Sequence, residues 1–464
     1  MAETDSTGAQ ERPNASAPAA TAPLPRSTVA YYGLSELPIS LSLFPVLVFI
    51  PKFYTSDLGV NLAFAANVIL AVRILDVLTD PLAGILCDRT QTRWGRRKPW
   101  LVAATPLMML SIYMLFLPPE GAGAAHLFGW MVTLSIATTM MLIPYYAWAA
   151  ELSPDYNERS RITGFRSMMG AIGSLIAQLV PAIALVAFGL GGSEAVLTIV
   201  GVTMLILMPI CVFLTVWKVP ETGEVSEQQT PFWRGLKLMG ENRPFLQLIL
   251  AFGVASTALS MTTPLYLFFI TFVLGAEEKA IFMLTFFYLT NVSAVPFWVW
   301  LSRKIGKHRA YVGSFGLIAI AHPFYLLLGP GDFWWMLPIT ITTGFAAGGF
   351  AALPNSMKAD VIDLDTLKSG ENRAGLFFST WSFTAKLAAS LGAWLALMGL
   401  SWFGFDSSPT GSNDADQLFG LRFLFALAPS VFYLGACALI WSYPITAERH
   451  AAMRAELAAA REAA

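Results

Sequence analysis

Twelve apolar stretches, each long enough to cross a lipid bilayer, recur along this chain of 464 residues. The hydrocarbon core of a bilayer takes about 20 residues of α-helix, and inside it every backbone polar group must be hydrogen-bonded within the helix. The sequence therefore predicts an all-α integral membrane protein with 12 transmembrane helices. The stretches lie near residues 29–52, 61–87, 100–118, 125–150, 163–190, 194–217, 245–274, 278–301, 310–329, 333–357, 375–403 and 417–443.

Composition excludes several other classes of protein. Charged residues make up only 13% of the chain, whereas a soluble domain carries about a quarter. The sequence has no P-loop, dinucleotide-binding or nucleophile-elbow motif, and Cys87, Cys211 and Cys437 lack the spacing of metal ligands. We therefore expect no enzyme activity, no catalytic residues, no cofactor and no nucleic-acid partner.

Polar segments divide the chain. Residues 1–28 are rich in Ala, Pro, Ser and Thr and contain no apolar run, which predicts a disordered cytoplasmic tail. The longest polar stretch in the interior, residues 218–244, separates the first six predicted helices from the last six. We thus expect six-helix bundles over residues 29–217 and 245–443, a cytoplasmic linker between them, and a cytoplasmic C-terminal tail over residues 444–464.

The charges of the loops predict the orientation in the membrane. The loop after the second predicted helix is rich in arginine between residues 89 and 98, and the loop after the eighth is basic between residues 303 and 309. The alternate loops are short and neutral or acidic. Because basic loops remain on the cytoplasmic side, we expect a multi-pass protein of a bacterial-type inner membrane with both termini in the cytoplasm.

Two aspartates, Asp76 and Asp80, lie inside the second apolar stretch. Since they are four residues apart, both carboxylates face the same side of a helix. A charge in the middle of a bilayer costs about 3 kcal/mol or more, so two like charges require a bound cation or a basic partner. The pattern indicates a site for a coupling ion, either a proton or a metal cation. The alternative is a structural ion pair with a basic residue such as Arg73.

The two halves of the chain also resemble each other. Residues 84–98 and 302–309 carry related glycine- and arginine-containing sequences at equivalent points, an arrangement that is similar to the major facilitator superfamily. That resemblance implies a substrate site at mid-membrane between the halves. More narrowly, the chain resembles the glycoside–pentoside–hexuronide:cation symporters over about residues 29–450. The motifs that carry this resemblance are residues 73–84, 93–100, 143–166 and 357–375.

The resemblance implies that Asp76 and Asp80 hold the coupling cation with help from Thr139. Where the melibiose-permease branch of the family carries a further acidic ligand in helix four, this sequence has Leu142. Na⁺ needs several oxygen ligands, whereas H⁺ needs a single carboxylate. The missing ligand therefore favours H⁺ as the coupling ion, with Na⁺ as the alternative.

Arg166 and Lys386 match charged residues of the family in helices five and eleven. We expect Lys386 to pair with one of the two aspartates and so to sense the bound cation, and Arg166 to orient the substrate. The alternative for Arg166 is that its side chain reaches the cytoplasmic interface. Ser40 stands where the family has its helix-one acid, and the loss of both this acid and the helix-four acid argues against a galactoside. Glu36, one turn away, either replaces one of the two acids or lies near the cytoplasmic end of helix one. Further candidates for substrate contact are Tyr145, Tyr146 and Trp381.

Another group of charged residues lies near the predicted cytoplasmic face. We expect these residues to form ion pairs between loops and to act as a latch that holds the outward-facing state. They are Asp88, Arg89, Arg96, Glu151, Arg159, Asp360, Asp363 and Arg373.

These features predict a cation-coupled secondary transporter that imports a small polar organic solute, a sugar or glycoside, by alternating access, and that acts as a monomer. One alternative is a cation-coupled transporter of lysolipids or other amphiphiles, because the apolar Leu142 suits an acyl chain. Another is a membrane sensor that no longer moves solute, although such a protein has no need of charges in the middle of the bilayer.

Overall fold

The computed structural model describes residues 24–153, 156–221, 240, 242–369, 374–408 and 411–445. Within these residues 12 helices are long and apolar enough to cross a membrane, which confirms the prediction of 12 transmembrane helices. The predicted tails beyond residues 24 and 445, the middle of the linker at 222–239, and Arg373 lie outside the described residues.

Six of the membrane-crossing helices are single α-helices, whereas the other six each join an α-helix to a second α-helix or to a π-helical or 3₁₀ segment. The α-helices are α1 (Arg26–Leu34), α2 (Glu36–Val48), α3 (Ile50–Lys52), α4 (Leu62–Arg89), α5 (Lys98–Phe116), α6 (Ala124–Glu151), α7 (Tyr156–Phe188), α8 (Ser193–Lys218), α10 (Arg243–Phe268), α11 (Ala280–Ile305), α12 (Lys307–Ala321), α13 (Met336–Ser369), α14 (Ala374–Trp402), α15 (Ala415–Arg422) and α16 (Ala428–Trp441). Short π-helical or 3₁₀ segments are η1 (Phe53–Asp57), η2 (Phe269–Leu274), η3 (Glu277–Lys279), η4 (His322–Leu327), η5 (Phe333–Trp335) and η6 (Phe423–Leu427).

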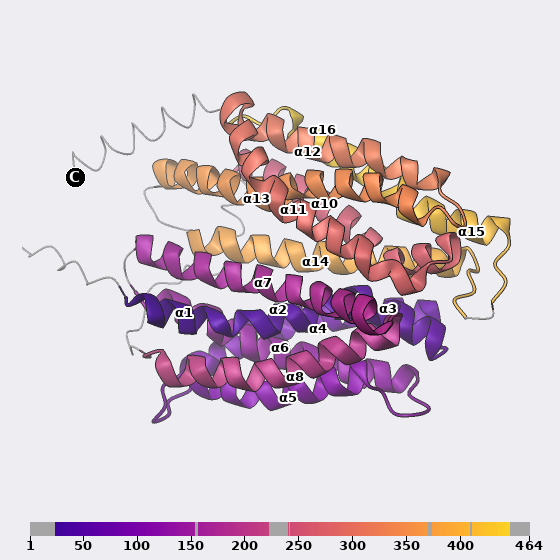
Figure 1. The fold of residues 1–464 in the computed structure, drawn as a ribbon. Coiled ribbons are helices and arrows are strands. Elements are labelled where there is room, and N and C mark those ends of the chain that lie inside the picture. The colour runs from indigo at the N-terminus through magenta and orange to yellow at the C-terminus, as the bar shows by residue number, and fades with distance from the viewer. Residues whose placement is uncertain are drawn as a thin grey trace, which may run out of the picture.

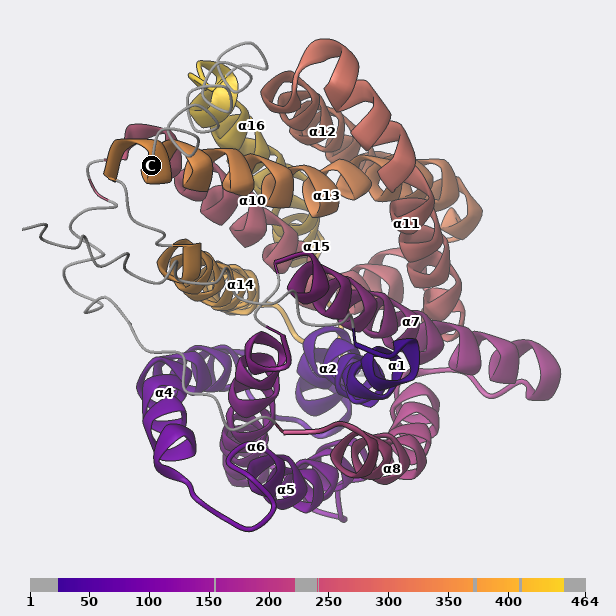
Figure 2. The same ribbon diagram turned by 90° about the vertical axis from the view of Figure 1, so that its left-hand side faces the viewer.

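The helices form two six-helix bundles. Figure 1 shows the first bundle, α1 to α8, in indigo and magenta, and the second, α10 to α16, in orange and yellow. Seen along the helices, the bundles lie side by side (Figure 2), and across their boundary α4 packs on α14, α7 on α11 and α2 on α10. The helix α1 begins and α16 ends at the same end of the molecule, which also carries the arginines of the α4–α5 loop (Figure 1). We call this the arginine-rich end, and the other the opposite end.

Polar caps and glycines set where helices begin and end. The Asn61 side chain accepts hydrogen bonds from two backbone amides at the start of α4, one of them from Ala63 at 2.9 Å. At the start of α15, Asp414 and Gln417 form a capping box. Gly275, with φ of 64°, takes the left-handed conformation that ends η2. These local signals separate neighbouring helices at the membrane surface.

The tenth membrane-crossing helix, α13, is longer than the sequence predicts. The expected stretch ends at residue 357 with a loop after it, but α13 continues to Ser369. Residues 358–368 contain no proline or glycine, and Met357, Val361 and Leu364 form a buried stripe along the extension. An amphipathic segment without a helix breaker continues the helix past the membrane surface. The prediction of a loop directly after residue 357 is therefore wrong.

Glycines permit the closest helix contact in the second bundle. A Cβ atom at Gly344 of α13 would lie 2.6 Å from the carbonyl oxygen of Phe287 in α11. A Cβ atom at Gly348 would lie 2.7 Å from the carbonyl oxygen of Asn291. Small residues let two helix backbones approach in this way inside a membrane. The packing of α13 against α11 therefore requires glycine at both positions.

We predict that Gly348→Ala lowers the stability of the purified protein by about 1–3 kcal/mol, because the added methyl group forces α13 away from α11. Thermal unfolding in detergent measures the effect as a lower Tm. The control is Gly316→Ala in α12, where a Cβ atom would meet nothing within 4 Å. Equal Tm values for the two variants would contradict the packing described for α11 and α13.

Candidate functional site

Two carboxylates of α4 face two hydroxyls of α6. Asp76 and Asp80 are one turn apart on α4, and Ser135 and Thr139 are one turn apart on α6. Ser135 Oγ donates a hydrogen bond to Asp76 Oδ1, and Thr139 Oγ1 donates one to Asp80 Oδ1 at 2.9 Å. The common spacing of four residues brings both pairs into register where the helices pack.

Asp80 also joins the two bundles. The Nζ atom of Lys386, on α14, donates a hydrogen bond to Asp80 Oδ2 and forms an ion pair with it. The prediction that Lys386 pairs with one of the two aspartates is confirmed. The side chains are 37% exposed for Lys386 and 23% for Asp80, so the rest of the protein covers the pair only in part.

Asp76 has a different environment. It is only 4% exposed, and Arg73 Nη1 lies 2.8 Å from its Oδ2 atom. The structure therefore contains the ion pair with Arg73 that the sequence left open as an alternative. This pair lies within one helix, whereas the Asp80 pair links two bundles.

The sequence analysis missed Ser135. The signal that indicates it is its position four residues before Thr139, which matches the spacing of the two aspartates. Next to the paired residues, the hydroxyls of Thr79 and Thr138 are buried and have no hydrogen-bond partner in the described part of the chain. Buried polar groups are rarely left without a partner. These are two further oxygen atoms on α4 and α6 that no hydrogen bond between described residues uses.

A second charged cluster lies in the first bundle. Tyr146 Oη donates a hydrogen bond of 3.4 Å to Glu36 Oε1, and Arg166 Nε lies 3.8 Å from Glu36 Oε2. The guanidinium carbon of Arg166 is 3.9 Å from the centre of the Tyr146 ring. Ser40 lies one turn beyond Glu36, and a Cβ atom at Gly170 of α7 would be 3.0 Å from atoms of both side chains. The structure thus brings Glu36, Ser40, Tyr146 and Arg166 together between α2, α6 and α7.

The other two aromatic candidates are packed into the protein. Tyr145 is fully buried, and its hydroxyl donates to the carbonyl oxygen of Tyr32 at 2.7 Å, while the Tyr32 hydroxyl donates to the carbonyl oxygen of Tyr145 at 2.6 Å. This reciprocal contact fixes α6 to α1. Trp381 is also buried, with its ring centre 4.1 Å from that of Phe252.

A cavity of about 410 Å³ lies in the second bundle, and α2 of the first bundle contributes to its wall. Its lining is mostly apolar and aromatic and contains no carboxylate, lysine or arginine among the described residues. Polar groups interrupt this lining at Ser260, Thr262, Thr263, Asn291, His322, Thr340 and Thr343. Pockets that bind organic ligands commonly combine an apolar wall with a few polar groups.

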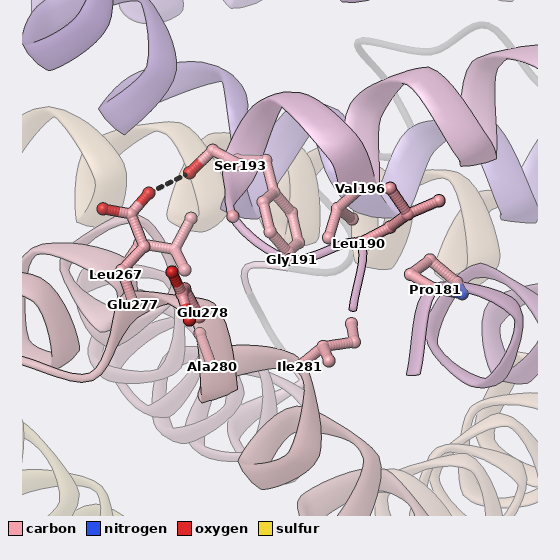
Figure 3. Close-up of a pocket in the computed structure, with 12 residues that line it drawn as sticks. Pro181, Leu190, Gly191, Ser193, Val196, Leu267, Glu277, Glu278, Ala280 and Ile281 are labelled. Carbon is pink, nitrogen blue, oxygen red and sulfur yellow. Dashed lines mark hydrogen bonds between the residues drawn. The ribbon is translucent and has the colours of Figure 1, made fainter. Parts of the chain in front are cut away.

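At the opposite end, a buried lysine ties the bundles together. Lys52 is 3% exposed, and its Nζ atom lies 2.7 Å from Glu277 Oε1 and 3.3 Å from Asp57 Oδ1. Ser193 of α8 donates a hydrogen bond of 2.8 Å to the same oxygen of Glu277, the bond drawn in Figure 3. Burial raises the pKa of the Asp57 carboxyl, although the Lys52 ammonium opposes this. Lys52 thus forms an ion pair with one carboxylate from each bundle, Asp57 in the first and Glu277 in the second.

At the arginine-rich end, Arg97 is the centre of an ion-pair cluster. Its Nη2 atom lies 2.5 Å from Glu151 Oε1 and 2.7 Å from Asp88 Oδ1, whereas Arg96 is 3.4 Å from Glu151. Burial disfavours the Arg97 charge, but the hydrogen bonds from its guanidinium to Glu151 and to Cys87 raise its pKa. The sequence analysis selected Arg96 for this group, and the structure adds Arg97 as the residue that joins its members.

The remaining residues of the predicted latch are spread along this end. Asp360 pairs with Lys307 at 2.6 Å inside the second bundle, and it lies on α13 with Asp363 rather than in a loop. Arg89 is exposed at the end of α4 and forms no ion pair with the described residues. Arg159 lies on α7, which begins before the predicted residue 163, and its side chain lies outside the described residues, as does Arg373.

Polar contacts between the bundles lie between the middle of the molecule and the opposite end. Trp394 Nε1 donates to Asn67 Oδ1, and Ser407 Oγ donates to the carbonyl oxygen of Thr55, both at 3.1 Å. The others involve Glu277 and the Asp80–Lys386 pair. At the arginine-rich end, no hydrogen bond or ion pair between two described residues joins the bundles. The polar contacts between described residues of the two bundles therefore lie at mid-membrane and toward the opposite end.

Comparisons with known proteins agree with this architecture. Residues 31–447 match the model of a family described as MFS/sugar transport protein. The chain is 27% identical over 463 residues to the sodium-dependent lysophosphatidylcholine symporter 1 of Mus musculus, and the match covers 90% of this chain and 85% of the mouse protein. It is 26% identical over 424 residues to the isoprimeverose transporter of Lactiplantibacillus pentosus, with 88% of this chain and 87% of that protein covered.

Solved structures share the fold. A bacterial homologue of the human lysosomal transporter Spinster, in an inward-facing and unoccupied conformation, has a TM-score of 0.63 at 16% identity and covers 93% of this chain and 96% of its own. The nucleoside transporter NupG has a TM-score of 0.64 at 15% identity and covers 90% of this chain and 100% of its own. At these identities the likeness extends to the fold alone.

We predict that Asp80 and Lys386 are energetically coupled. Asp80→Asn and Lys386→Met each leave one charge without its partner, so each variant lowers the free energy of unfolding. The double variant should lose less stability than the sum of the two single losses. Because both side chains are partly exposed, we expect a coupling of about 1 kcal/mol, measured from thermal unfolding in detergent. The control combines Asp80→Asn with Lys304→Met on the exposed face of α11, where the effects should add. Additive effects for Asp80 and Lys386 would refute the pair.

Proposed function

Because this chain belongs to the MFS/sugar transport protein family, we propose that it is a cation-coupled symporter that imports a small organic solute by alternating access. The observation that carries this proposal is the Asp80–Lys386 ion pair, which lies within the membrane-spanning helices and links the bundles. A charge pair in this position links cation binding directly to the relative movement of the two bundles.

The proposed cation site consists of Asp76, Asp80, Ser135 and Thr139. Ser135 supplies the oxygen that Leu142 does not, so two carboxylates and two hydroxyls face one another across α4 and α6. Hard cations bind to such oxygen atoms. We therefore propose Na⁺ as the coupling ion, in keeping with the sodium-dependent relative, and H⁺ as the alternative that the experiment below distinguishes.

In the proposed cycle, Na⁺ and the Lys386 ammonium compete for Asp80. When the cation binds, the lysine is released, and the link between α4 and α14 opens. When the cation leaves, the ammonium returns and neutralises the carboxylate. The Asp80 carboxylate has a cationic partner in both states, so it is never left unpaired in the bilayer while the bundles move.

The solute proposed first is a sugar or glycoside. Glu36, Arg166 and Tyr146 offer a carboxylate, a guanidinium and an aromatic hydroxyl in one cluster, and hydroxyl-rich ligands need such donors and acceptors. The isoprimeverose transporter among the relatives supports this class. In this proposal Arg166 orients the solute and Ser40 lines the same cluster, whereas Tyr145 and Trp381 support the site from the packed interior.

A second candidate solute is a lysolipid or a similar amphiphile. The cavity of the second bundle favours it, because most of its wall is apolar and aromatic. The lysophosphatidylcholine symporter among the relatives supports the same class. A sensor that moves no solute accounts for neither the cavity nor the charge pair.

We further propose that the arginine-rich end faces the cytoplasm of a bacterial-type inner membrane, as the positive-inside rule requires, with both termini on that side and a single chain as the working unit. The contacts at the opposite end then close the outer side, which corresponds to an inward-facing state. The charged residues of the arginine-rich end are proposed to rearrange into a latch between the bundles when that side closes.

We predict that reconstituted vesicles take up solute when an inward Na⁺ gradient is applied, and that Asp80→Asn reduces this uptake by at least about tenfold. Sugars, aryl glycosides and lysolipids are screened as solutes, each under a Na⁺ gradient or a pH gradient. The control is Asp416→Asn, which removes an exposed carboxylate at the start of α15.

Uptake driven by a pH gradient alone would make the carboxylate pair a proton site. Uptake of lysolipids alone would favour the second candidate solute. Gradient-driven uptake that persists in Asp80→Asn would refute the proposed coupling site.

We predict that Glu277→Gln weakens the closure of the opposite end, because the Lys52 ammonium loses its charged partner in the second bundle. A cysteine placed at Thr263 in the cavity wall, in a background without the native cysteines, should react several times faster with a membrane-impermeant thiol reagent added from outside. The matched control is Glu278→Gln, the neighbouring exposed carboxylate. The same labelling rate in both variants would count against the Lys52–Glu277 contact as a closure.

A further inference from the structure

Lys358 is a buried cation that the proposed cycle does not use. It lies on α13, is 4% exposed, and forms no ion pair with any described residue. Its Nζ atom donates one hydrogen bond of 3.3 Å to Asn355 Oδ1. An ammonium has three N–H donors, so the contacts with the described residues leave Lys358 without a charged partner and with donors to spare.

Aromatic rings hold the ammonium in place. The Nζ atom is 4.2 Å from the ring centre of Phe378 and 4.8 Å from that of Trp381, both on α14. Such cation–π contacts are favourable, but they offset only part of the desolvation of a full charge. The site is not sealed, because Asn355 is exposed and Phe378 is 54% exposed. A ligand can therefore approach the ammonium.

The spacing along α13 places Lys358 on the same face of the helix as residues that line the cavity. Thr340, Ala347 and Ala351 line the cavity of the second bundle. Residues at steps of three or four continue the same face of a helix, and Asn355 and Lys358 are the next two positions on that face. With a rise of about 1.5 Å per residue, Lys358 lies about 10 Å beyond Ala351, toward the arginine-rich end.

The positive charge of Lys358 complements the uncharged lining of the cavity. The cavity lining has no carboxylate, lysine or arginine, so Lys358 provides the nearest positive charge along that face of α13. A ring contact also links the two regions, because Trp381 packs on Phe252 and Phe252 stacks on the cavity residue Phe350. The arrangement is an apolar chamber with a cationic group at one end.

We infer that Lys358 is a specificity-determining residue that binds an anionic oxygen group of the transported solute, either a carboxylate or a phosphate, while the uncharged part of the solute occupies the cavity. This inference rests on the proposed transport function and narrows its substrate class to solutes that carry a negative group. It assigns a role to Lys358 separate from that of Lys386, whose ammonium is already paired with Asp80.

The test compares matched ligands that differ in one charge. Methyl β-glucuronide and methyl β-glucoside represent a carboxylate and its neutral counterpart, and lysophosphatidic acid and monoacylglycerol do the same for a phosphate. Binding to the purified full chain in nanodiscs of zwitterionic lipid is measured without an ion gradient. Lys358→Met removes the charge, Lys358→Arg keeps it, and Lys304→Met is the control, because that exposed lysine also lies over a tryptophan ring, at 4.6 Å from Trp300.

We expect the wild type to prefer the anionic member of one pair, and Lys358→Met to weaken that binding by about tenfold or more while the neutral member changes little. Lys358→Arg and Lys304→Met should retain the preference. The pair that shows the effect tells whether the group is a carboxylate or a phosphate.

Two results would overturn the inference: no anionic preference in the wild type, or the same preference in Lys358→Met. A purely structural role would lower the Tm and weaken both members of a pair equally, which also contradicts it. Since binding is measured without a gradient, loss of ion-driven uptake with the preference intact would argue against the proposed function instead.

Discussion

The account depends on the ion pair between Asp80 and Lys386. A carboxylate and an ammonium within the bilayer are both unfavourable alone, and each stabilises the other across the boundary between the bundles. Asp76, one turn away, is neutralised within its own helix by Arg73. The two carboxylates therefore have distinct partners, and only the partner of Asp80 moves with the other bundle. In the proposed cycle, this difference lets the binding of a small cation change the contact between the bundles.

The polar contacts of the described residues differ between the two ends of the molecule. The bundles are joined at mid-membrane by the Asp80–Lys386 pair and at the opposite end by the contact of Lys52 and Ser193 with Glu277. At the arginine-rich end, the ion pairs that join two described residues lie inside one bundle. An alternating-access protein must break the first set of contacts before it can close the other end. The energy of the mid-membrane pair is thus part of the barrier between the two states.

The sequence predicted the helices and the members of the central ion pair, because both depend on local patterns. Runs of apolar residues identify membrane helices, and the spacing of Asp76 and Asp80 places them on one face. The sequence pattern alone did not show which helix packs against the two aspartates, so Ser135 was missed. The buried Lys52 was missed as well. The extension of α13 was missed because its residues are amphipathic rather than uniformly apolar. The bounds of the cytoplasmic tails and the linker, and the roles of the site residues, stay predictions.

Competition between Na⁺ and Lys386 for Asp80 is tested most directly by equilibrium binding of radiolabelled Na⁺ to the purified protein. The account predicts that Lys386→Met binds Na⁺ more tightly than the wild type, because the competing ammonium is gone, and that Asp80→Asn does not bind it. Equal affinity in the wild type and Lys386→Met would contradict the competition and, with it, the proposed coupling mechanism.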